Sequence, residues 1–254
     1  MNHAKWIAHF QRNREHRPEP NWAAPFVLPE SVLQPLRLSI AEYQLGDGGG
    51  PACLIAGDAE QFRSSSDAMR QIVDLWFAEE REHSRLLGCA VARIGARRVH
   101  AHWSFTAFLA CRRAMGVRVE LQVLLLVEIV STVYYRLLRR HCPDPPLREM
   151  CSLILRDEAG HVAFHRDRLA AAGVSNWGLG GTLWELQFRL FGLAAAALLW
   201  LTHGRCLRAL GAGRLEFCRE IHRDLSRFVR RLGRTAQART HPTMPAAQLA
   251  GQTA

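Results

Sequence analysis

Two Glu-x-x-His motifs are the residues of this chain best suited to chemistry. Glu80 precedes His83 by three positions, and Glu158 precedes His161 by the same spacing. Residues three apart on a helix project from one face, so each motif offers a carboxylate and an imidazole to a single point. Each motif can therefore supply two ligands to a metal ion inside a bundle of helices.

Both motifs lie in phase with the apolar residues of their own segments. Core-facing positions between 69 and 94 follow one another at spacings of four and three, and they include Glu80 and His83. The segment 147–168 places Glu158 and His161 in the same way. An ionised carboxylate without a partner is strongly disfavoured in a helical core, so some group must compensate these charges.

A further carboxylate repeats the pattern. Glu128 lies inside the apolar run 121–130, in phase with its leucines, and we expect it to face inward. Glu128 precedes Glu158 by 30 residues, and Asp47 precedes Glu80 by 33 residues. These spacings indicate a duplicated pair of helices, in which each pair supplies one carboxylate and then one Glu-x-x-His motif.

Four carboxylates and two imidazoles balance the charge of two divalent cations. Oxygen-rich ligation with limited imidazole and no thiolate favours iron or manganese, or a mixed pair, over zinc or copper(I). The alternative is a buried hydrogen-bonded network of Glu, His and Arg without metal. The predicted metal ligands are Asp47, Glu80, His83, Glu128, Glu158 and His161.

Caps and periodicity predict helices throughout, and no strand pattern competes with them. We expect helices from near Pro29 to at least Leu45, from the serines at 64–66 to Ile94, and from about Trp103 to Arg140 with a break allowed at Gly116. Three further helices are expected. One covers 144–173, an apolar one follows the glycine-rich link at 178–181 and ends at about His203, and an amphipathic one runs from about Leu215 to Leu232. The predicted organisation is an N-terminal arm over 1–28 that has no sustained period and packs on the domain through Trp6, Phe10 and Trp22, a four-helix bundle over 29–173, a C-terminal helical extension over 174–234 and a disordered tail over 235–254.

The composition narrows the class of protein. The chain carries a formal charge of +10, but Lys5 is its one lysine and the arginines are spread along the helices, so we expect a solvated surface and no nucleic-acid partner. Seven cysteines without a C-x-x-C motif indicate reduced thiols. The N-terminus lacks the continuous apolar segment of a signal peptide, which together with the thiols predicts a cytoplasmic protein. A homodimer is left open.

One apolar run needs a separate interpretation. Residues 193–201, extended back to Leu190, form about a dozen mostly apolar positions, which is too short for an ordinary membrane span. The run indicates a buried helix that covers the bundle, or a surface for lipid or a partner.

Three segments resemble the metal-binding helices of the ferritin-like di-iron carboxylate superfamily, which includes rubrerythrins and acyl-carrier-protein desaturases. They are FAEEREHSRLL, LLLVEIVSTVYYRLL and ILRDEAGHVAFH, and the resemblance covers residues 30–172. It implies that Glu80 and Glu158 ligate or bridge the metals, that His83 and His161 are terminal nitrogen ligands, and that Glu128 is the third-helix carboxylate. In this family an acidic residue just before each motif glutamate often orients the opposite histidine, and Glu79 and Asp157 occupy those places.

The chain departs from this family in its first helix. Asp47 lies at the expected sequence distance but within a glycine-rich stretch, whereas Glu42 has the longer side chain and the better helical context. Glu42 is therefore the alternative ligand. His165, four residues beyond His161, is either an additional ligand or a hydrogen-bonded core residue.

The resemblance implies a reduced di-iron site that binds dioxygen. We expect an oxygen-dependent oxidase or monooxygenase that acts on a small or lipid-like organic substrate, with the electron donor left open. Ferroxidase or peroxide-scavenging activity is a second hypothesis. A third is a non-catalytic binding or scaffold protein with an incomplete metal site.

Overall fold

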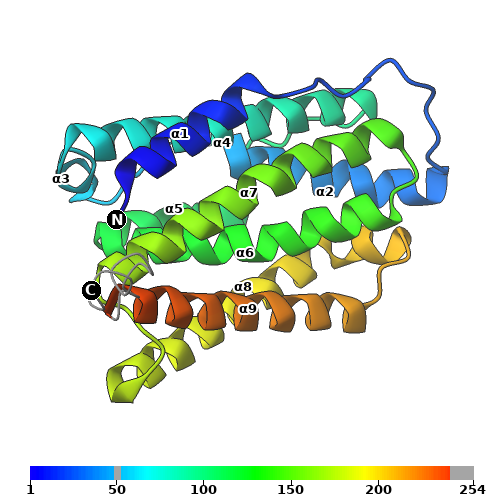
Figure 1. The fold of residues 1–254 in the computed structure, drawn as a ribbon. Helices are drawn as coiled ribbons and strands as arrows, with labels where there is room; N and C mark the ends of the chain where they lie inside the picture. Colours follow the sequence, from blue (N-terminus) through cyan, green and yellow to red (C-terminus); the bar gives the residue numbers. More distant parts are fainter. Residues whose placement is uncertain (49–52, 241–254) are drawn as a thin grey trace, which may run out of the picture.

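The computed structural model describes residues 1–48 and 53–240, and Figure 1 shows their arrangement. Within these ranges every regular element is an α-helix, which confirms the expected all-α class. The helices are α1 (His3–Glu15), α2 (Glu30–Gly48), α3 (Ala59–Arg63), α4 (Asp67–Arg93), α5 (Trp103–Ala114), α6 (Val117–His141), α7 (Pro145–Ala171), α8 (Gly178–Ala209) and α9 (Arg214–Thr240).

The two helices that carry the motifs begin and end where the local sequence predicts. The Ser66 side chain accepts a hydrogen bond from the backbone N–H of Met69 at the start of α4, and Asp144 does the same for Leu147 at the start of α7. Gly95 and Gly173 follow the helix ends with φ of 61° and 79°, a conformation that favours glycine. Local chemistry therefore sets the limits of α4 and α7.

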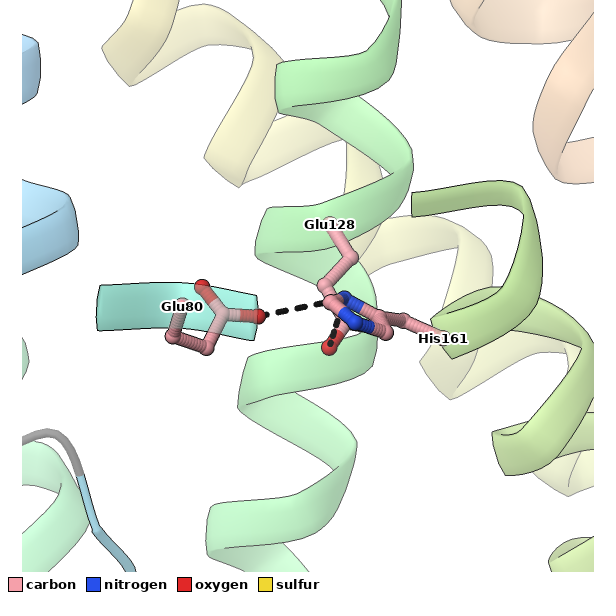
Figure 2. Close-up of side chains that lie close together, drawn as sticks. All are labelled: Glu80, Glu128 and His161. Carbon is pink, nitrogen blue, oxygen red and sulfur yellow. Dashed lines mark ion pairs between the residues drawn. The ribbon is translucent and has the colours of Figure 1, made fainter. Parts of the chain in front are cut away.

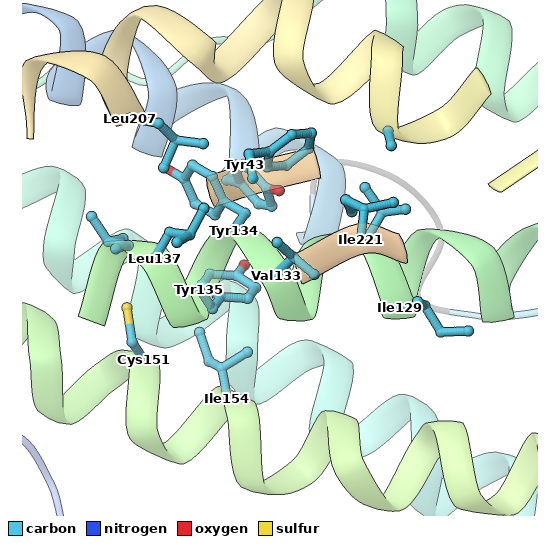
Figure 3. Packing of buried hydrophobic residues seen from close by; sticks show 14 of the residues in the cluster. Tyr43, Ile129, Val133, Tyr134, Tyr135, Leu137, Cys151, Ile154, Leu207 and Ile221 are labelled. Carbon is cyan, nitrogen blue, oxygen red and sulfur yellow. The ribbon is translucent and has the colours of Figure 1, made fainter. Parts of the chain in front are cut away.

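Four helices surround the position of the motifs. α2 packs on α4, α6 packs on α7, and α4 contacts α7. Because α6 and α7 are joined by the three residues 142–144, they must run antiparallel. Figure 3 shows how Tyr134 and Tyr135 of α6 pack among apolar side chains from several other helices, so the core is continuous around α6.

The predicted N-terminal arm contains a helix, which corrects the expectation for residues 1–28. α1 lies across α4 and α7 and buries Trp6 and Phe10. These two aromatic residues stand four positions apart, so they share one face. The polar residues between them hide the periodicity, so the sequence indicated the packing of Trp6 and Phe10 but not the helix that carries them.

The helix predicted over 103–140 is divided in two at Gly116. α5 ends at Ala114, and α6 begins at Val117 after Gly116 takes an extended conformation with ψ of 164°. Asp58 Oδ1 accepts a hydrogen bond from the Val117 backbone N–H at 2.6 Å, so a residue distant in sequence caps the new helix. The division lets α5 leave the axis of α6.

The C-terminal helices are part of the main core and are longer than predicted. α8 packs on α2 and α6, and α9 packs on α6 and α7. Phe188, Leu207 and Phe228 belong to the same buried cluster as Tyr134. α9 continues to Thr240, so the tail predicted as disordered over 235–254 is helical through 240, and residues 241–254 lie outside the described residues.

Two of the described helices, α6 and α8, are long and apolar enough to cross a membrane by length and composition. Two-thirds of the apolar window of α6 is buried in the molecule, as expected for a core helix, whereas 28% of the α8 window is buried. The short apolar run predicted at 193–201 is therefore the centre of a much longer apolar helix.

Candidate metal centre

Three helices bring five predicted ligands together. α4 supplies Glu80 and His83, α6 supplies Glu128, and α7 supplies Glu158 and His161. Potential ligand atoms of Glu80, Glu128 and His161 lie within 4.8 Å of one another, and so do those of Glu80, His83 and Glu158. The two groups share Glu80, so they form one cluster with two adjacent positions for an ion.

The distances place one nitrogen of each imidazole among the carboxylates. His161 Nδ1 lies 3.1 Å from Glu80 Oε1 and 3.4 Å from Glu158 Oε2. His83 Nδ1 lies 3.8 Å from Glu80 Oε2 and 3.7 Å from Glu158 Oε1. Figure 2 shows Glu80, Glu128 and His161 converging from three different helices.

The other nitrogen of each imidazole is held by a carboxylate outside the cluster. His83 Nε2 lies 3.1 Å from Asp157 Oδ2, and His161 Nε2 lies 2.8 Å from Glu79 Oε2. Because an ionised carboxylate only accepts, Nε2 carries a proton in both rings, and Nδ1 is the nitrogen that faces the cluster. Both hydrogen bonds are those predicted from the sequence, and each joins α4 to α7.

Several buried atoms of the cluster have no hydrogen-bond partner among the described residues. Both imidazole Nδ1 atoms are in this state, as are both carboxylate oxygens of Glu128 and Oε2 of Glu158. Leaving buried polar atoms unsatisfied costs free energy, and native structures rarely do so. All five atoms are of types that coordinate divalent cations, so the residues present fit a metal centre of nitrogen and oxygen ligands.

The charges of the cluster shift the pKa values of its members. Burial alone would lower the pKa of His83, but the hydrogen bond with Asp157 and the nearby carboxylates of Glu80 and Glu158 raise it to about 10. The pKa of His161 is also raised well above its ordinary value, because surrounding glutamates outweigh burial. Burial raises the pKa of Glu128 well above its usual range. A positive charge is strongly favoured between these carboxylates, and a divalent cation would compete with the imidazole protons.

Two buried side chains support the cluster in ways that the sequence did not identify. Trp76 donates its indole N–H to Glu80 Oε1 at 3.2 Å, in addition to the core packing expected of it. Arg17 forms an ion pair with Asp157, the carboxylate that holds His83. The spacing of Trp76 and Glu80 by one helical turn was the available signal, whereas nothing local pointed to Arg17.

His165 lies beside the cluster but in neither group of potential ligands. Its Nε2 is 3.6 Å from Glu128 Oε2, and its Nδ1 is 3.4 Å from the Arg168 guanidinium. Because Arg168 can only donate, His165 Nδ1 accepts and Nε2 carries the proton. Burial lowers the pKa of His165 well below its ordinary value. These features support a neutral core residue rather than a further ligand.

The two first-helix candidates have different outcomes. Glu42 belongs to neither group of potential ligands, and its carboxylate lies 3.8 Å from His102 Nε2 and 3.9 Å from His203 Nδ1. Burial raises the pKa of Glu42. Asp47 falls in the last turn of α2, but its side chain lies outside the described residues. The prediction that Asp47 is a ligand therefore stays a prediction.

α1 closes one side of the cluster. Phe10 packs at 6.0 Å from the His161 ring, measured between centroids, and is almost completely buried. Gly160 of α7 allows this approach, because a Cβ at that position would overlap the His9 ring. The glycine inside the segment Glu158–His161 thus serves close packing of α1 against the site.

A cavity of about 240 Å³ opens on the other side of the cluster. Glu80, Glu128 and Glu158 form part of its wall, so it is continuous with the candidate metal centre. Most of the remaining wall is apolar and comes from α4, α5, α6 and α8. These apolar residues include Phe77, Phe105, Phe108, Leu124, Leu198 and Leu199.

One polar group of residues interrupts the apolar wall. Glu42, His102 and His203 all line the cavity. The Ser39 hydroxyl lies 3.0 Å from His203 Nδ1 and 2.7 Å from the Tyr134 hydroxyl. Burial lowers the pKa of His203 to about 3, so its ring is neutral near pH 7, and burial also raises the pKa of Glu42. Neither His102 nor His203 lies in a motif, so the local sequence carries no signal for this polar group.

Comparison of the chain with protein-family models, with curated proteins and with solved structures found no match.

Proposed function

We propose that this chain is a ferritin-like di-iron carboxylate protein that activates dioxygen and oxidises an organic substrate. The observation that carries the proposal is the convergence of three carboxylates, of which Glu128 and Glu158 are buried, and two buried imidazole Nδ1 atoms, from three helices. The anchoring of each outer Nε2 by Glu79 or Asp157 adds support, because metal-ligating histidines usually have such a partner.

The side chains of the cluster have distinct roles in this proposal. Glu80 and Glu158 lie closest to both imidazoles and would ligate both metal positions, while His83 and His161 would each ligate one. Glu128 would hold the position next to His161. Iron, or manganese in its place, would supply the redox electrons that dioxygen reduction requires. The protein's part is to keep both imidazoles in the tautomer that presents Nδ1.

The cavity supports the choice of an organic substrate. Its wall is mostly apolar, and a smaller cavity of about 150 Å³ already accommodates benzene. A substituted aromatic ring or a short alkyl chain therefore fits the available volume. Neutral His203 can orient one uncharged polar group of such a molecule without introducing charge.

The same cavity favours this proposal over the two alternatives. Iron oxidation or peroxide removal would need access for small hydrophilic species, and a largely apolar wall of this size serves neither. A scaffold protein with a vestigial site would have no reason to keep five unpartnered ligand atoms buried.

Anaerobic titration with iron(II), followed by exposure to oxygen, tests the proposal. The expected result is an uptake of about two irons per chain and an oxygen-dependent change in the absorption and Mössbauer spectra. Glu158→Gln should lower iron uptake, whereas Glu149→Gln, an exposed residue on the same helix, should not.

The products of oxygen exposure separate the alternatives. Turnover with iron or hydrogen peroxide alone, at rates unaffected by apolar compounds, would favour the ferroxidase or scavenging hypothesis. A parent protein that takes up no iron at stoichiometric concentration would contradict the metal-centre proposal itself. Slower product formation in Ala195→Phe, with unchanged iron content, would place the substrate in the cavity that Ala195 lines.

A further inference from the structure

One side of α8 exposes an apolar stripe to solvent. Seven large apolar residues of this helix are between 51% and 79% exposed. Most follow one another at spacings of four and three, so they share one face of the helix. Figure 1 shows the first part of α8 extending away from the other helices, below α9. The exposed residues are Leu179, Leu183, Leu186, Leu190, Phe191, Leu193 and Leu201.

The opposite side of α8 already has its own packing partners. Phe188, Gly192 and Ala196 are buried against the core, and Leu198 and Leu199 line the cavity. α8 therefore does not have the single apolar face of an ordinary surface helix. Contiguous exposed apolar surface of this extent marks an interaction site in soluble proteins, so the outer stripe needs an occupant.

The charges beside the stripe identify the kind of occupant. Residues 174–240 contain eleven arginines and four acidic residues. Arg230, Arg231 and Arg234 of α9 are exposed, and none forms an ion pair with a described residue. Arg230 and Arg234 border the same surface depression as Trp177, the residue directly before α8. Exposed leucines, a tryptophan and arginines without an ion-pair partner among the described residues thus lie next to one another.

We propose that this face binds an anionic lipid bilayer. The leucine stripe of α8 would enter the boundary between headgroups and acyl chains, while the α9 arginines would contact lipid phosphates. Trp177 is suited to the level of the headgroups, because its ring is apolar and its N–H is polar. α8 would lie in the interface and would not span it, since its inner side is packed on α2 and α6.

A second copy of this chain fits the face less well. A two-fold contact through α8 would bring the unpaired arginines of two copies, each with a formal charge of +10, toward one another. An anionic surface instead attracts these same arginines. The proposal is independent of the metal centre, because none of its residues belongs to the cluster.

Co-sedimentation with lipid vesicles tests this proposal on the full chain. We expect strong binding to vesicles of equal parts phosphatidylcholine and phosphatidylglycerol, and weak binding to phosphatidylcholine alone. Binding should decrease as salt is added. The triple variant L183S/L186S/L190S should reduce the partition coefficient about tenfold or more.

Matched variants separate the two contributions. R230Q/R234Q should lose most of the preference for the anionic vesicles, while R70Q, an exposed arginine on α4, should keep it. L215S, an exposed leucine at the start of α9, should bind like the parent. Absence of vesicle binding by the parent would overturn the proposal. Dimerisation that depends on Leu183, Leu186 and Leu190 without any vesicle binding would assign the face to a second copy.

Discussion

At the scale of single residues, the site depends on which nitrogen of each imidazole faces inward. Asp157 and Glu79 hold the Nε2 protons of His83 and His161, so both Nδ1 atoms point at the carboxylates. The arrangement is reciprocal, because α7 orients the histidine of α4 and α4 orients the histidine of α7. Loss of one outer carboxylate should therefore weaken the metal centre without removing a ligand.

We predict that Asp157→Asn lowers metal affinity by about 10- to 100-fold, because an amide stabilises the inward lone pair of His83 less than a carboxylate does. The measurement is a competition titration with a metal indicator. Asp167→Asn is the matched control, since Asp167 lies on the same helix but pairs with the surface residue Lys5. Equal affinities in Asp157→Asn and the parent would show that this carboxylate does not support a ligand.

Two variants of α2 test whether Asp47 or Glu42 is a metal ligand. If Asp47 completes the centre, Asp47→Ala should lose one of about two irons per chain, because one metal position loses a carboxylate. Glu42→Gln should keep both irons, since Glu42 contacts His102 and His203 and lies in neither ligand group. Metal analysis after gel filtration gives the occupancies. The reverse ranking would make Glu42 the ligand.

His203 should make stability depend on pH in a defined direction. Its folded-state pKa is about 3, against an ordinary value of 6.5, because burial and His102 disfavour the charged ring. Between these values the unfolded chain binds a proton that the folded chain does not, so the His203 contribution to stability decreases as pH falls from 6.5 toward 3. The free energy of unfolding, measured with denaturant, should therefore fall less between pH 7 and pH 4.5 in His203→Asn than in the parent. Parallel losses in the two proteins would contradict the low pKa.

At the scale of elements, the site is covered by a helix that needs a glycine beneath it. α1 approaches α7 where Gly160 lies between Glu158 and His161, and Phe10 then packs beside the His161 ring. A side chain at this position would separate the two helices, even though alanine is otherwise a better helix former than glycine. The Glu-x-Gly-His sequence thus combines two ligands with one packing position.

We predict that Gly160→Ala destabilises the protein by about 1–3 kcal/mol, because the added Cβ would overlap the His9 ring and overpack the contact. It should also speed metal loss to a chelator by loosening α1 over His161. Denaturant unfolding and a chelator assay measure the two effects. Gly57→Ala is the control, since no atom lies within 4 Å of the added Cβ. A stabilised Gly160→Ala protein would show that α1 does not pack here.

At the scale of the whole molecule, α8 and α9 complete the core that the first seven helices begin. Phe228 of α9 stacks on Phe188 of α8 at 5.2 Å between ring centroids, and both are buried in the cluster that surrounds Tyr134. α8 also forms a wall of the cavity beside the candidate metal centre. The predicted boundary at residue 173 therefore does not separate two hydrophobic cores.

Phe228→Ala should lower the free energy of unfolding by about 3–5 kcal/mol, as expected for a large side chain removed from a shared core. Leu215→Ala should change it by less than about 0.5 kcal/mol, because Leu215 is 69% exposed near the start of the same helix. Both values follow from denaturant unfolding curves. A single cooperative transition is expected in each case, and an early transition confined to Phe228→Ala would show that α8 and α9 unfold separately.

The sequence by itself determined which residues could meet. Glu80 and His83, like Glu158 and His161, lie three apart in phase with an apolar seam, and this local period placed all four side chains inside the molecule. The same reasoning placed Glu128 inward, whereas the partners of the histidines, Glu79 and Asp157, were implied by the resemblance to the ferritin-like superfamily. Caps at Ser66 and Asp144 likewise set the helix limits, because capping involves only neighbouring residues.

Only the tertiary structure decided what surrounds these residues. The placement of α1 over Gly160, the ion pair of Arg17 with Asp157 and the meeting of Glu42 with His203 join positions more than a hundred residues apart. Local periodicity carries no information about such pairs, because it specifies a buried face but not the helix that covers it. For the same reason the apolar run of α8 left a buried helix and a surface for lipid or a partner as alternatives in the sequence, and the exposure of its stripe follows from the positions of its neighbours.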